Sequence, residues 1–466
     1  MKTDTAESLF YQANHQMAQG QWDAAENSFH LALQLEPDLA EVHANLAWLL
    51  QQQKRYAEAG AAYQRARLLA PDNVQISLNY GVMLAQERRF AEAEQLYRQV
   101  LLQHPDSIFA LCNLGVLLAS TLHETEAEAC YRRALELDPA YRKAAFNLAY
   151  LLLRQGHYAE GWHMLEAREA PAILDYYLSQ QPHALRWQGQ ELRGKSIIIL
   201  FESGHGDTIQ FTRYASLLKQ AGATRVTCLC HPALKRLFAS LEGLDEVFAY
   251  DENIPGSACD YWVPMYSLPG LFHTQIDSIP AKLPYLHAHP QDVQHWAARM
   301  QGPDKHLRIG LVWQGNPLFD NDGYRSIHDL AVFKTLVDIP GVHWFSLQKA
   351  EGVGAASDMP LALTSLGSDI RDFADTAAII MQLDLLITVD TAVAHLAGAL
   401  GKPCWLMLPA YQADWRWLKD RADSLWYPAV MRLFRQKYSG DWSAVMQEIK
   451  DELMKLPAIS KYSVFS

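Results

Sequence analysis

The sequence lacks the segments that would mark a secreted or membrane-spanning chain. Its start, MKTDTAESLFYQ, has no apolar core of signal-peptide length and no cleavage pattern. The most apolar long stretch, residues 376–409, is interrupted by Asp384, Asp390 and His395, so it does not predict a membrane span. These absences predict a cytoplasmic protein.

Basic charge and cysteine are also scarce. The 40 Lys and Arg are outnumbered by 52 Asp and Glu, and the net charge of −12 argues against a nucleic-acid-binding protein, since phosphate backbones are bound by basic patches. An acidic protein can still bind an acidic metabolite or a nucleotide sugar, because a single local pocket can be positive. The six cysteines are scattered, which is typical of reduced thiols, and CLCHP has no second Cys/His cluster to complete a zinc site.

The first 160 residues repeat with the 34-residue period of tetratricopeptide repeats. Prolines at the end of each segment set the period, and three further columns of residues keep the same register. One holds alanines, where two helices must cross closely, and one holds aromatic residues that fill the groove between helices. The third marks the turn into each second helix. The fourth repeat has Glu124 at that turn, and a helix pair from about 145 to 169 is typical of a capping repeat. The columns are Pro37, Pro71, Pro105 and Pro139; Ala25, Ala59, Ala93 and Ala127; Phe29, Tyr63, Tyr97 and Tyr131; and Trp22, Tyr56, Phe90 and Tyr158.

One column is not needed for packing. Position six of the first helix is Tyr11 in the first repeat and asparagine in the following ones, at Asn45, Asn79, Asn113 and Asn147. An asparagine side chain donates to and accepts from a peptide backbone at once, so a stacked column can hold an extended chain without reading its sequence. The alternative is that these asparagines are ordinary polar surface residues.

From about residue 195 the pattern changes to alternating strands and helices, which implies parallel sheets. The proline-rich PAKLPYLHAHP divides this region into two blocks, and we predict two Rossmann-like domains with ligands at the carboxyl ends of their strands. The predicted organisation is repeats over 1–170, a linker over 171–194, an N-terminal Rossmann-like domain over 195–290, and a C-terminal Rossmann-like domain with a final helix over 291–466.

The segment LDLLITVDTAVAHLAGALGKP predicts an anion site in the second block. A strand over 383–389 leads into a helix that Asp390 or Thr391 would cap, and the free N–H groups of a helix start bind phosphate. Small residues along the helix permit a close approach of backbone to ligand. His395 lies on the same face as Thr391, where it would donate to a phosphate or sugar hydroxyl, or serve only as a structural hydrogen-bonding group.

In the first block, ESGHGDTIQF follows a strand and opens a helix. It lacks the third glycine of a dinucleotide fingerprint, so NAD is not expected. Asp207 with Gln210 fits a capping box, which is a structural role. The functional alternative is that the Asp207 carboxylate projects into the cleft as a general base for an acceptor hydroxyl.

Other strand ends carry further candidates on the donor side. Asp320 and Asp322 in FDND form an Asp-x-Asp, for which a turn is the preferred explanation over a metal site. Arg325 is a candidate for a charge-assisted phosphate contact. Gln348 and Lys349 follow another strand, where the lysine has a solvated loop position as its alternative role.

Nine segments in order resemble bacterial tetratricopeptide-repeat glycosyltransferases, whose transfer domain is similar to the heptosyltransferase family and has the GT-B fold. The resemblance covers Trp187 to about Leu456, and the repeats match as well. It implies a catalytic base at Asp207, a donor-phosphate turn at Asp390, Thr391 and His395, and a donor side that includes Trp313 and Asn316. The segments are GHGDTIQFTRY, LVWQGNP, YRSI, SLQK, DTAAII, ITVDTAVAHLAGALGKP, DWRW, WYP and LFRQ.

The resemblance implies an inverting, metal-independent glycosyltransferase that needs no cofactor beyond a nucleotide-activated sugar as substrate. The basic residues with which heptosyltransferases hold lipid A core phosphates have no equivalent here, which argues against a lipopolysaccharide acceptor. Some repeat-fused relatives glycosylate flagellin, often with nonulosonic acids such as pseudaminic acid, so the expected acceptor is a protein, with flagellin Ser/Thr as the specific expectation. The alternatives are a saccharide or lipid-linked acceptor, and a non-enzymatic repeat-based adaptor with a degenerate transferase domain.

Overall fold

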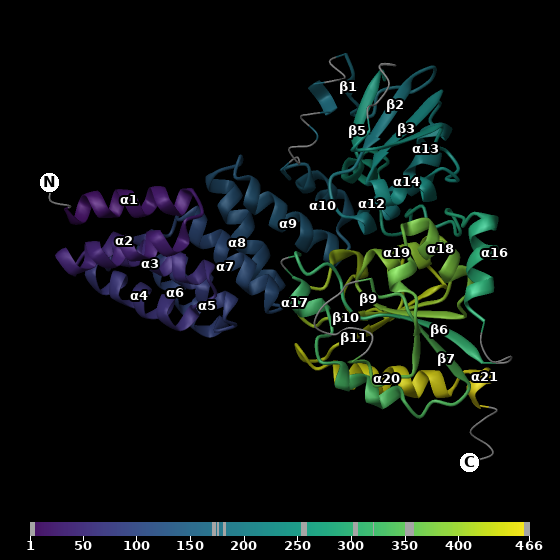
Figure 1. Ribbon diagram of the computed structural model, residues 1–466. Coiled ribbons are helices and arrows are strands. Elements are labelled where there is room, and N and C mark those ends of the chain that lie inside the picture. The colour runs from purple at the N-terminus through teal and green to yellow at the C-terminus, as the bar shows by residue number, and fades with distance from the viewer. Residues whose placement is uncertain are drawn as a thin grey trace. The chain divides into compact units, whose positions relative to one another are not determined.

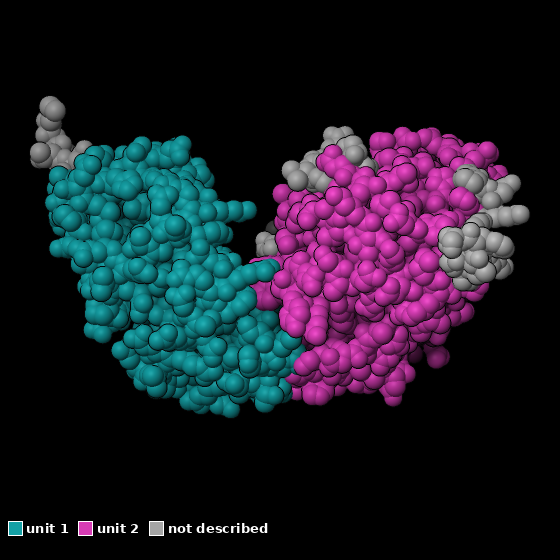
Figure 2. Space-filling model, turned by 90° about the horizontal axis from the view of Figure 1, so that it is seen from below, with its two compact units in different colours: residues 1–148 teal, residues 149–466 magenta. Residues whose placement is uncertain are grey.

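The computed structural model describes residues 5–169, 174, 177–179, 183–252, 259–301, 306–319, 321–349 and 358–460. The chain divides into two compact units, residues 1–148 and 149–466 (Figure 2). Across the described ranges, no helix is both long and apolar enough to cross a membrane. All six cysteines are free thiols.

The first unit is a solenoid of paired helices (Figure 1). Each second helix begins on the predicted turn column, including the one that starts at Glu124, so the 34-residue register is confirmed. The paired helices are α1 (Ala6–Ala18) and α2 (Trp22–Leu35), α3 (Ala40–Gln52) and α4 (Tyr56–Leu69), α5 (Val74–Gln86) and α6 (Phe90–Gln103), and α7 (Ile108–Ser120) and α8 (Glu124–Leu137). They are followed by α9 (Arg142–Gln155) and α10 (Tyr158–Leu165).

The alanine and aromatic columns fill the helix crossings as predicted. All four alanines of the column are 0% exposed, and the four aromatic residues are at most 2% exposed. In two repeats the aromatic ring lies against a glycine of the paired first helix: a Cβ on Gly81 would overlap the ring of Tyr97, and a Cβ on Gly115 would lie 2.6 Å from Cε1 of Tyr131. Small residues are therefore needed on both sides of the crossing.

The second unit contains two sheets in which all paired strands are parallel. The first has the order β1-β5-β2-β3-β4 and the second has the order β11-β10-β9-β6-β7-β8 (Figure 1). The first sheet comprises β1 (Leu185–Arg186), β2 (Ser196–Leu200), β3 (Arg225–Cys230), β4 (Glu246–Ala249) and β5 (Tyr261–Pro264). The second comprises β6 (Leu307–Val312), β7 (Val342–Ser346), β8 (Leu363–Ser365), β9 (Leu385–Val389), β10 (Cys404–Leu408) and β11 (Met431–Arg435). The predicted fold class, a tetratricopeptide solenoid followed by two Rossmann-like domains, is confirmed.

Each sheet has one topological switch point, where the chain returns to the other side of its first strand. In the first sheet the chain runs outward through β2, β3 and β4 and then returns to β5, beside β2. In the second it runs outward through β6, β7 and β8 and then returns to β9, beside β6. Open parallel sheets bind ligands at such points, beyond the carboxyl ends of the strands.

Several elements differ from the sequence expectation. The short edge strand β1 lies inside the segment predicted as a linker and pairs with β5. Where the alternation of strands and helices predicts an α-helix, residues 326–341 contain a 3₁₀ helix over Leu330–Leu336, whose first turn Asp329 caps by accepting from the Ala331 N–H. The division between units falls within α9, so α10 belongs with the α/β sheets. The predicted domain boundaries stay predictions.

Candidate active site

The helices that leave the two switch points contact each other. After β2 comes α12 (His205–Phe211), after β9 comes α19 (Ala392–Ala399), and the two helices pack together (Figure 1). A Cβ on Gly206 of α12 would lie 2.8 Å from Cδ2 of His395 and 3.4 Å from Cα of Ala392. Within α19, a Cβ on Gly398 would overlap the ring of Tyr427. The small residues of this segment therefore accommodate α12 and a tyrosine ring.

A buried arginine connects the two switch points. Arg416 is 5% exposed, and its guanidinium hydrogen-bonds the Asp207 carboxylate and, at 2.5 Å, Oε1 of Gln210, both on α12. Its other terminal nitrogen lies 2.8 Å from Oδ2 of Asp414. A planar fork with several donors suits this bridging position, because each nitrogen reaches a separate acceptor.

The ion pair fixes the charge of Asp207. Burial alone would raise the pKa of this carboxyl, but the Arg416 guanidinium outweighs burial and holds the pKa below its usual value. In the same way, burial would lower the pKa of Arg416, but Asp414 and Asp207 raise it well above its usual value. Asp207 is therefore ionised, in the form that accepts a proton, across the physiological pH range.

Asp207 is not the helix cap that the sequence allowed. The N-cap of α12 is Gly204, whose position makes no side-chain capping bond, and Asp207 lies within the first turn of the helix. The capping-box prediction for Asp207 and Gln210 is therefore wrong, because both side chains turn to Arg416 on the other domain. The role of Asp207 as a base stays a prediction.

At the second switch point, Asp390 lies at the start of α19. Its Oδ2 accepts a 2.8 Å hydrogen bond from the Trp417 indole N–H. Burial, reinforced by the Asp414 carboxylate, raises the pKa of Asp390 to about 6, while Trp417 and Arg325 oppose the shift. Thr391 is the N-cap of α19 but makes no side-chain capping bond, so its side chain leaves the first N–H groups of α19 uncapped.

His395 is buried between the two helices, at 5% exposure. Its Nδ1 hydrogen-bonds the Tyr427 hydroxyl at 2.9 Å, and its ring lies 5.4 Å from the ring of Trp417. Burial and then the Arg416 charge lower the pKa of His395 to about 3, so the ring is neutral at physiological pH. These contacts agree with the structural role that the sequence left open, and a donor-binding role stays a prediction.

Among the other predicted donor residues, two are buried and support the backbone. Trp313 is 0% exposed. Gln348 accepts at Oε1 from the N–H groups of Trp313 and Gln314, at 3.2 and 3.1 Å, and donates from Nε2 to the Gln314 carbonyl at 3.3 Å. These bonds connect the carboxyl ends of β6 and β7, so Gln348 sets the shape of the second switch point.

The remaining donor candidates are more accessible. Asn316 and Lys349 are exposed, and the Lys349 ammonium donates to the Arg371 carbonyl at 3.2 Å. Arg325 lies 3.5 Å from the Asp322 carboxylate and 4.8 Å from the centre of the Phe319 ring. Asp322 accepts from the Ser326 hydroxyl at 2.6 Å, which fits the predicted turn, and Asp320 lies outside the described residues.

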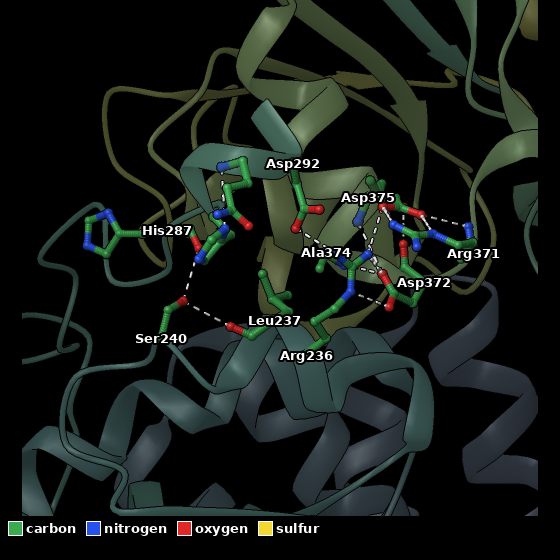
Figure 3. Close-up of polar contacts among 12 residues, drawn as sticks. Arg236, Leu237, Ser240, His287, Asp292, Arg371, Asp372, Ala374 and Asp375 are labelled. Carbon is green, nitrogen blue, oxygen red and sulfur yellow. Dashed lines mark hydrogen bonds and ion pairs between the residues drawn. The ribbon is translucent and has the colours of Figure 1, made fainter. Parts of the chain in front are cut away.

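A second arginine connects the domains at the flank of this contact. Arg236 of α14 (Pro232–Phe238) points toward three carboxylates, as Figure 3 shows. It forms two bonds of 2.8 and 2.7 Å with Asp372 and single bonds of 2.7 Å with Asp375 and Asp292. Asp372 caps α18 (Phe373–Gln382), and Asp292 lies in α16 (Pro290–Arg299). Arginine side chains thus join the two α/β domains at several contacts, since buried Arg213 also donates across them to the Trp426 carbonyl at 2.8 Å.

In the solenoid, the asparagine column is partly buried. Asn45 donates to Oδ1 of Asn14 at 2.8 Å, Asn79 accepts from the Gln75 amide at 2.7 Å, and Asn147 lies 3.5 Å from the Cys112 sulfur. The Asn113 side chain forms no hydrogen bond with another described residue. Acceptor binding by the column stays a prediction.

Sequence reasoning missed the residues that surround Asp207. Arg416, Asp414 and Trp417 lie in DWRW and Tyr427 lies in WYP, two segments that served only as marks of resemblance. The available signal was compositional: an arginine between two tryptophans, with an aspartate directly before them, predicts charges inside an aromatic core, which need a partner.

The comparisons with known proteins identify the repeats. Two tetratricopeptide repeat models match, one at residues 16–76 and 50–114 and the other at 125–161. Protein FlbA of Caulobacter vibrioides is 27% identical over 331 residues, which cover 66% of this chain. The chain spans 54% of the length of that relative.

Solved structures resemble the solenoid. A structure from a functional characterisation of Pseudomonas aeruginosa PilF is 20% identical, covers 38% of this chain and 81% of that chain, and has a TM-score of 0.33. YrrB, described as a TPR protein with an unusual peptide-binding site, is 18% identical over 35% of this chain and 84% of that chain, with a TM-score of 0.29. With TM-scores below 0.5, these similarities support no conclusion about function.

Proposed function

We propose that this protein is a GT-B glycosyltransferase that moves a sugar from a nucleotide-activated donor to a protein acceptor held by the repeats. The donor binds the domain that contains β6 and β9, and the acceptor hydroxyl approaches from the domain that contains β2 and β5. Tetratricopeptide repeats typically bind protein partners, which supports a protein acceptor. A flagellin Ser/Thr acceptor and a nonulosonic acid such as pseudaminic acid are the specific expectations.

The observation that carries this proposal is the meeting of the two switch points. Parallel α/β sheets bind ligands at these points, and here α12 of one sheet packs on α19 of the other. Asp207, Arg416 and Asp390 gather at this contact. A reaction between two substrates, each bound by one domain, requires two switch points that face each other.

The chemistry follows from the charges at this contact. The acceptor oxygen attacks the anomeric carbon, the bond from that carbon to the nucleotide phosphate breaks with its electrons, and the Asp207 carboxylate takes the acceptor proton. Arg416 keeps Asp207 ionised, although the same pairing lowers its affinity for the proton. Attack opposite the leaving group inverts the anomeric configuration.

The leaving phosphate needs positive charge. The uncapped start of α19 and the partly exposed guanidinium of Arg325 provide it without a metal ion. An ionised Asp390 carboxylate opposes this positive charge. The pKa of about 6 keeps part of the Asp390 population protonated, and so uncharged, near neutral pH.

Intact-mass analysis of candidate acceptors co-expressed with the enzyme tests the proposal. A mass increase that equals one sugar residue identifies the acceptor and the sugar together. Co-expression with Asp207→Asn is the matched control, and the mass increase should be lost. Acceptors that co-purify without modification, from an enzyme that binds no nucleotide, would instead support the adaptor alternative.

The metal-free chemistry has a separate test. Enzyme stripped of metal and assayed with EDTA should transfer at the rate of untreated enzyme. A loss of transfer that Mg²⁺ or Mn²⁺ restores would show that a cation, rather than α19 and Arg325, neutralises the leaving phosphate.

A further inference from the structure

The first helices of the solenoid form one continuous surface. Helix α1 contacts α3, α3 contacts α5, and α5 contacts α7. The exposed side of each helix therefore continues into the exposed side of the next. Continuous surfaces of this kind are the binding surfaces of repeat proteins.

Helices α3, α5 and α7 each contribute four side chains to this surface, at the spacing i, i+4, i+7 and i+11 that places residues on one face. The asparagine column is the second member, and an apolar column is the third. The four-residue stripes, which together we call the ladder face, are Glu41, Asn45, Trp48 and Gln52 on α3; Gln75, Asn79, Val82 and Gln86 on α5; and Phe109, Asn113, Val116 and Ser120 on α7.

The apolar column is unusually accessible for such side chains. Trp48, Val82 and Val116 are 38%, 37% and 41% exposed, and they lie one helical turn beyond the asparagines. Phe109, at the start of the α7 stripe, is 59% exposed. Trp48 and Phe109 also contact aromatic rings of the solenoid, with ring centres 6.1 Å from Trp22 and 5.8 Å from Tyr141, but the exposed parts of these side chains recur at every period and provide apolar contact area for a partner.

Charge is excluded from the same surface. Helices α5 and α7 contain no Asp, Glu, Lys or Arg, and Glu41 is the one charged residue in the three stripes. The charges of the repeats lie elsewhere, in exposed ion pairs such as Arg65 with Asp38 and Arg133 with Asp106. Except beside Glu41, a partner with charged side chains would lose their hydration on the ladder face without gaining an opposite charge.

The amides further define the backbone of the partner. A helical segment satisfies its own N–H and C=O groups, so it would leave the asparagine column unused. An extended segment presents unpaired backbone groups, and its side chains alternate between the two sides of the strand. One side can then pack on the apolar column while the backbone meets the amides.

We propose that the ladder face binds an uncharged, extended segment of the acceptor protein, with apolar side chains seated on Trp48, Val82 and Val116. The inference rests on the proposed function only in naming the acceptor as the occupant. It adds that the ladder face selects the segment by its side chains. The asparagines can bond to the backbone of any sequence. The apolar column and the scarcity of charge discriminate against both acidic and basic segments.

Fluorescence anisotropy with three labelled peptides tests this on the full chain. The peptides have capped ends and about ten residues, enough to cross three helices. One alternates Val with Ser and Thr, and the other two carry either Lys or Glu in place of alternate Val residues. The neutral peptide should bind, and both charged peptides should bind at least ~10-fold more weakly.

Two results would overturn the proposal. One is tighter binding of the Lys or the Glu peptide than of the neutral peptide. The other is no binding of the neutral peptide at about 1 mM, the weakest affinity expected of a specific contact.

Matched variants localise the binding. The paired change Val82→Glu and Val116→Glu should weaken neutral-peptide binding at least ~10-fold. The control pair is Leu68→Glu and Leu102→Glu, on the second helices, where the leucines are 76% and 84% exposed. The control should change binding less than ~2-fold, and equal effects of both pairs would contradict the assignment to the ladder face.

Nucleotide-sugar turnover, measured on the same variants, separates this proposal from the proposed function. Loss of both peptide binding and transfer to the acceptor in the Val82→Glu and Val116→Glu protein, with both retained in the control pair, supports both proposals. Selective binding of the neutral peptide by a protein that turns over no donor would retain the ladder-face proposal and reject the enzyme.

Discussion

Arginine–carboxylate pairs occur in two different settings in this chain. In the solenoid, Arg65 pairs with Asp38 at 2.5 Å, and the two side chains are 48% and 72% exposed. In the α/β unit, Arg416 pairs with Asp207, and the two side chains are 5% and 17% exposed. Water screens the first pair, so it contributes little, whereas the second pair has lost its hydration and depends on both partners being present.

Contact geometry alone therefore does not tell how much each pair contributes to stability. Both are formed at hydrogen-bond distance, but in the buried pair the Arg416 guanidinium also has to outweigh burial in order to hold the pKa of the Asp207 carboxyl below its usual value. The same residue types therefore form solvent-screened ion pairs between repeats, and between the domains they form a buried ion pair that keeps Asp207 ionised.

Removal of the acid from the buried pair should have the largest effect. In Asp207→Asn, the amide oxygen can still accept from Arg416, so the fold should persist, but the side chain no longer takes a proton. The transfer rate should fall by ~10²–10⁴-fold with little change in donor affinity. Rate and thermal midpoint are measured on one preparation, with Asp38→Asn as the control from the exposed pair. A stable Asp207→Asn enzyme with a near wild-type rate would reject Asp207 as the base.

Removal of the base from the buried pair should mainly reduce stability. Arg416→Leu leaves Asp207 and Asp414 buried without their cation, which costs about 3–5 kcal/mol. Differential scanning calorimetry of the full chain should show the loss in the transition of the α/β unit, with the solenoid transition unchanged. A loss below about 1 kcal/mol would mean that water reaches this pair much as it reaches Arg65.

The contribution of the Asp390 carboxyl, near the start of α19, to the unfolding free energy should depend on pH. Because burial raises the pKa of Asp390 to about 6, its contribution to stability is fully present below the usual value of 3.8 and is lost as pH rises through about 6. From pH 5 to pH 7.5, the wild type should lose about 1 kcal/mol of unfolding free energy relative to Asp390→Asn. Urea unfolding at both pH values measures this, and parallel stability profiles for the two proteins would contradict the raised pKa.

The smallest effect is expected at the exposed pair. Arg65→Ala should change the unfolding free energy by about 0–1 kcal/mol, and added salt should reduce even that difference. Urea unfolding at low and high salt is the measurement. A salt-independent loss as large as that of Arg416→Leu would remove the distinction between the two settings.

The solenoid was predictable because its information is local and repeated. Ala59 and Tyr63 occur with equivalents at every 34 residues, so each copy supports the others, and a crossing of neighbouring helices needs no contact over long sequence distance. The edge strand β1 was not predictable in this way. It has two residues in a segment of linker composition, and only its pairing with β5 makes it a strand.

The candidate site was predictable only in part. Strand ends and helix starts directed attention to Asp207 and Asp390, and both lie at the contact between the switch points. The pairing of Asp207 with Arg416 joins residues 209 positions apart, for which a single sequence holds no periodic signal. The small residues of α19 predicted a close approach of backbone to ligand, and that approach stays a prediction. The structure shows Gly206 of α12 and the Tyr427 ring packed against this helix, which sequence could not reveal.

The missing side chain at Gly206 has a consequence for mutational robustness. A Cβ there would lie 2.8 Å from Cδ2 of His395 and 3.4 Å from Cα of Ala392, so any other residue would require His395 or the two helices to shift. In a library of all single substitutions, position 206 should therefore tolerate as few residues as a fully buried position, although it lies in the first turn of a helix and is only half-buried. Its variants should also lose stability, which thermal unfolding of the purified variants would measure.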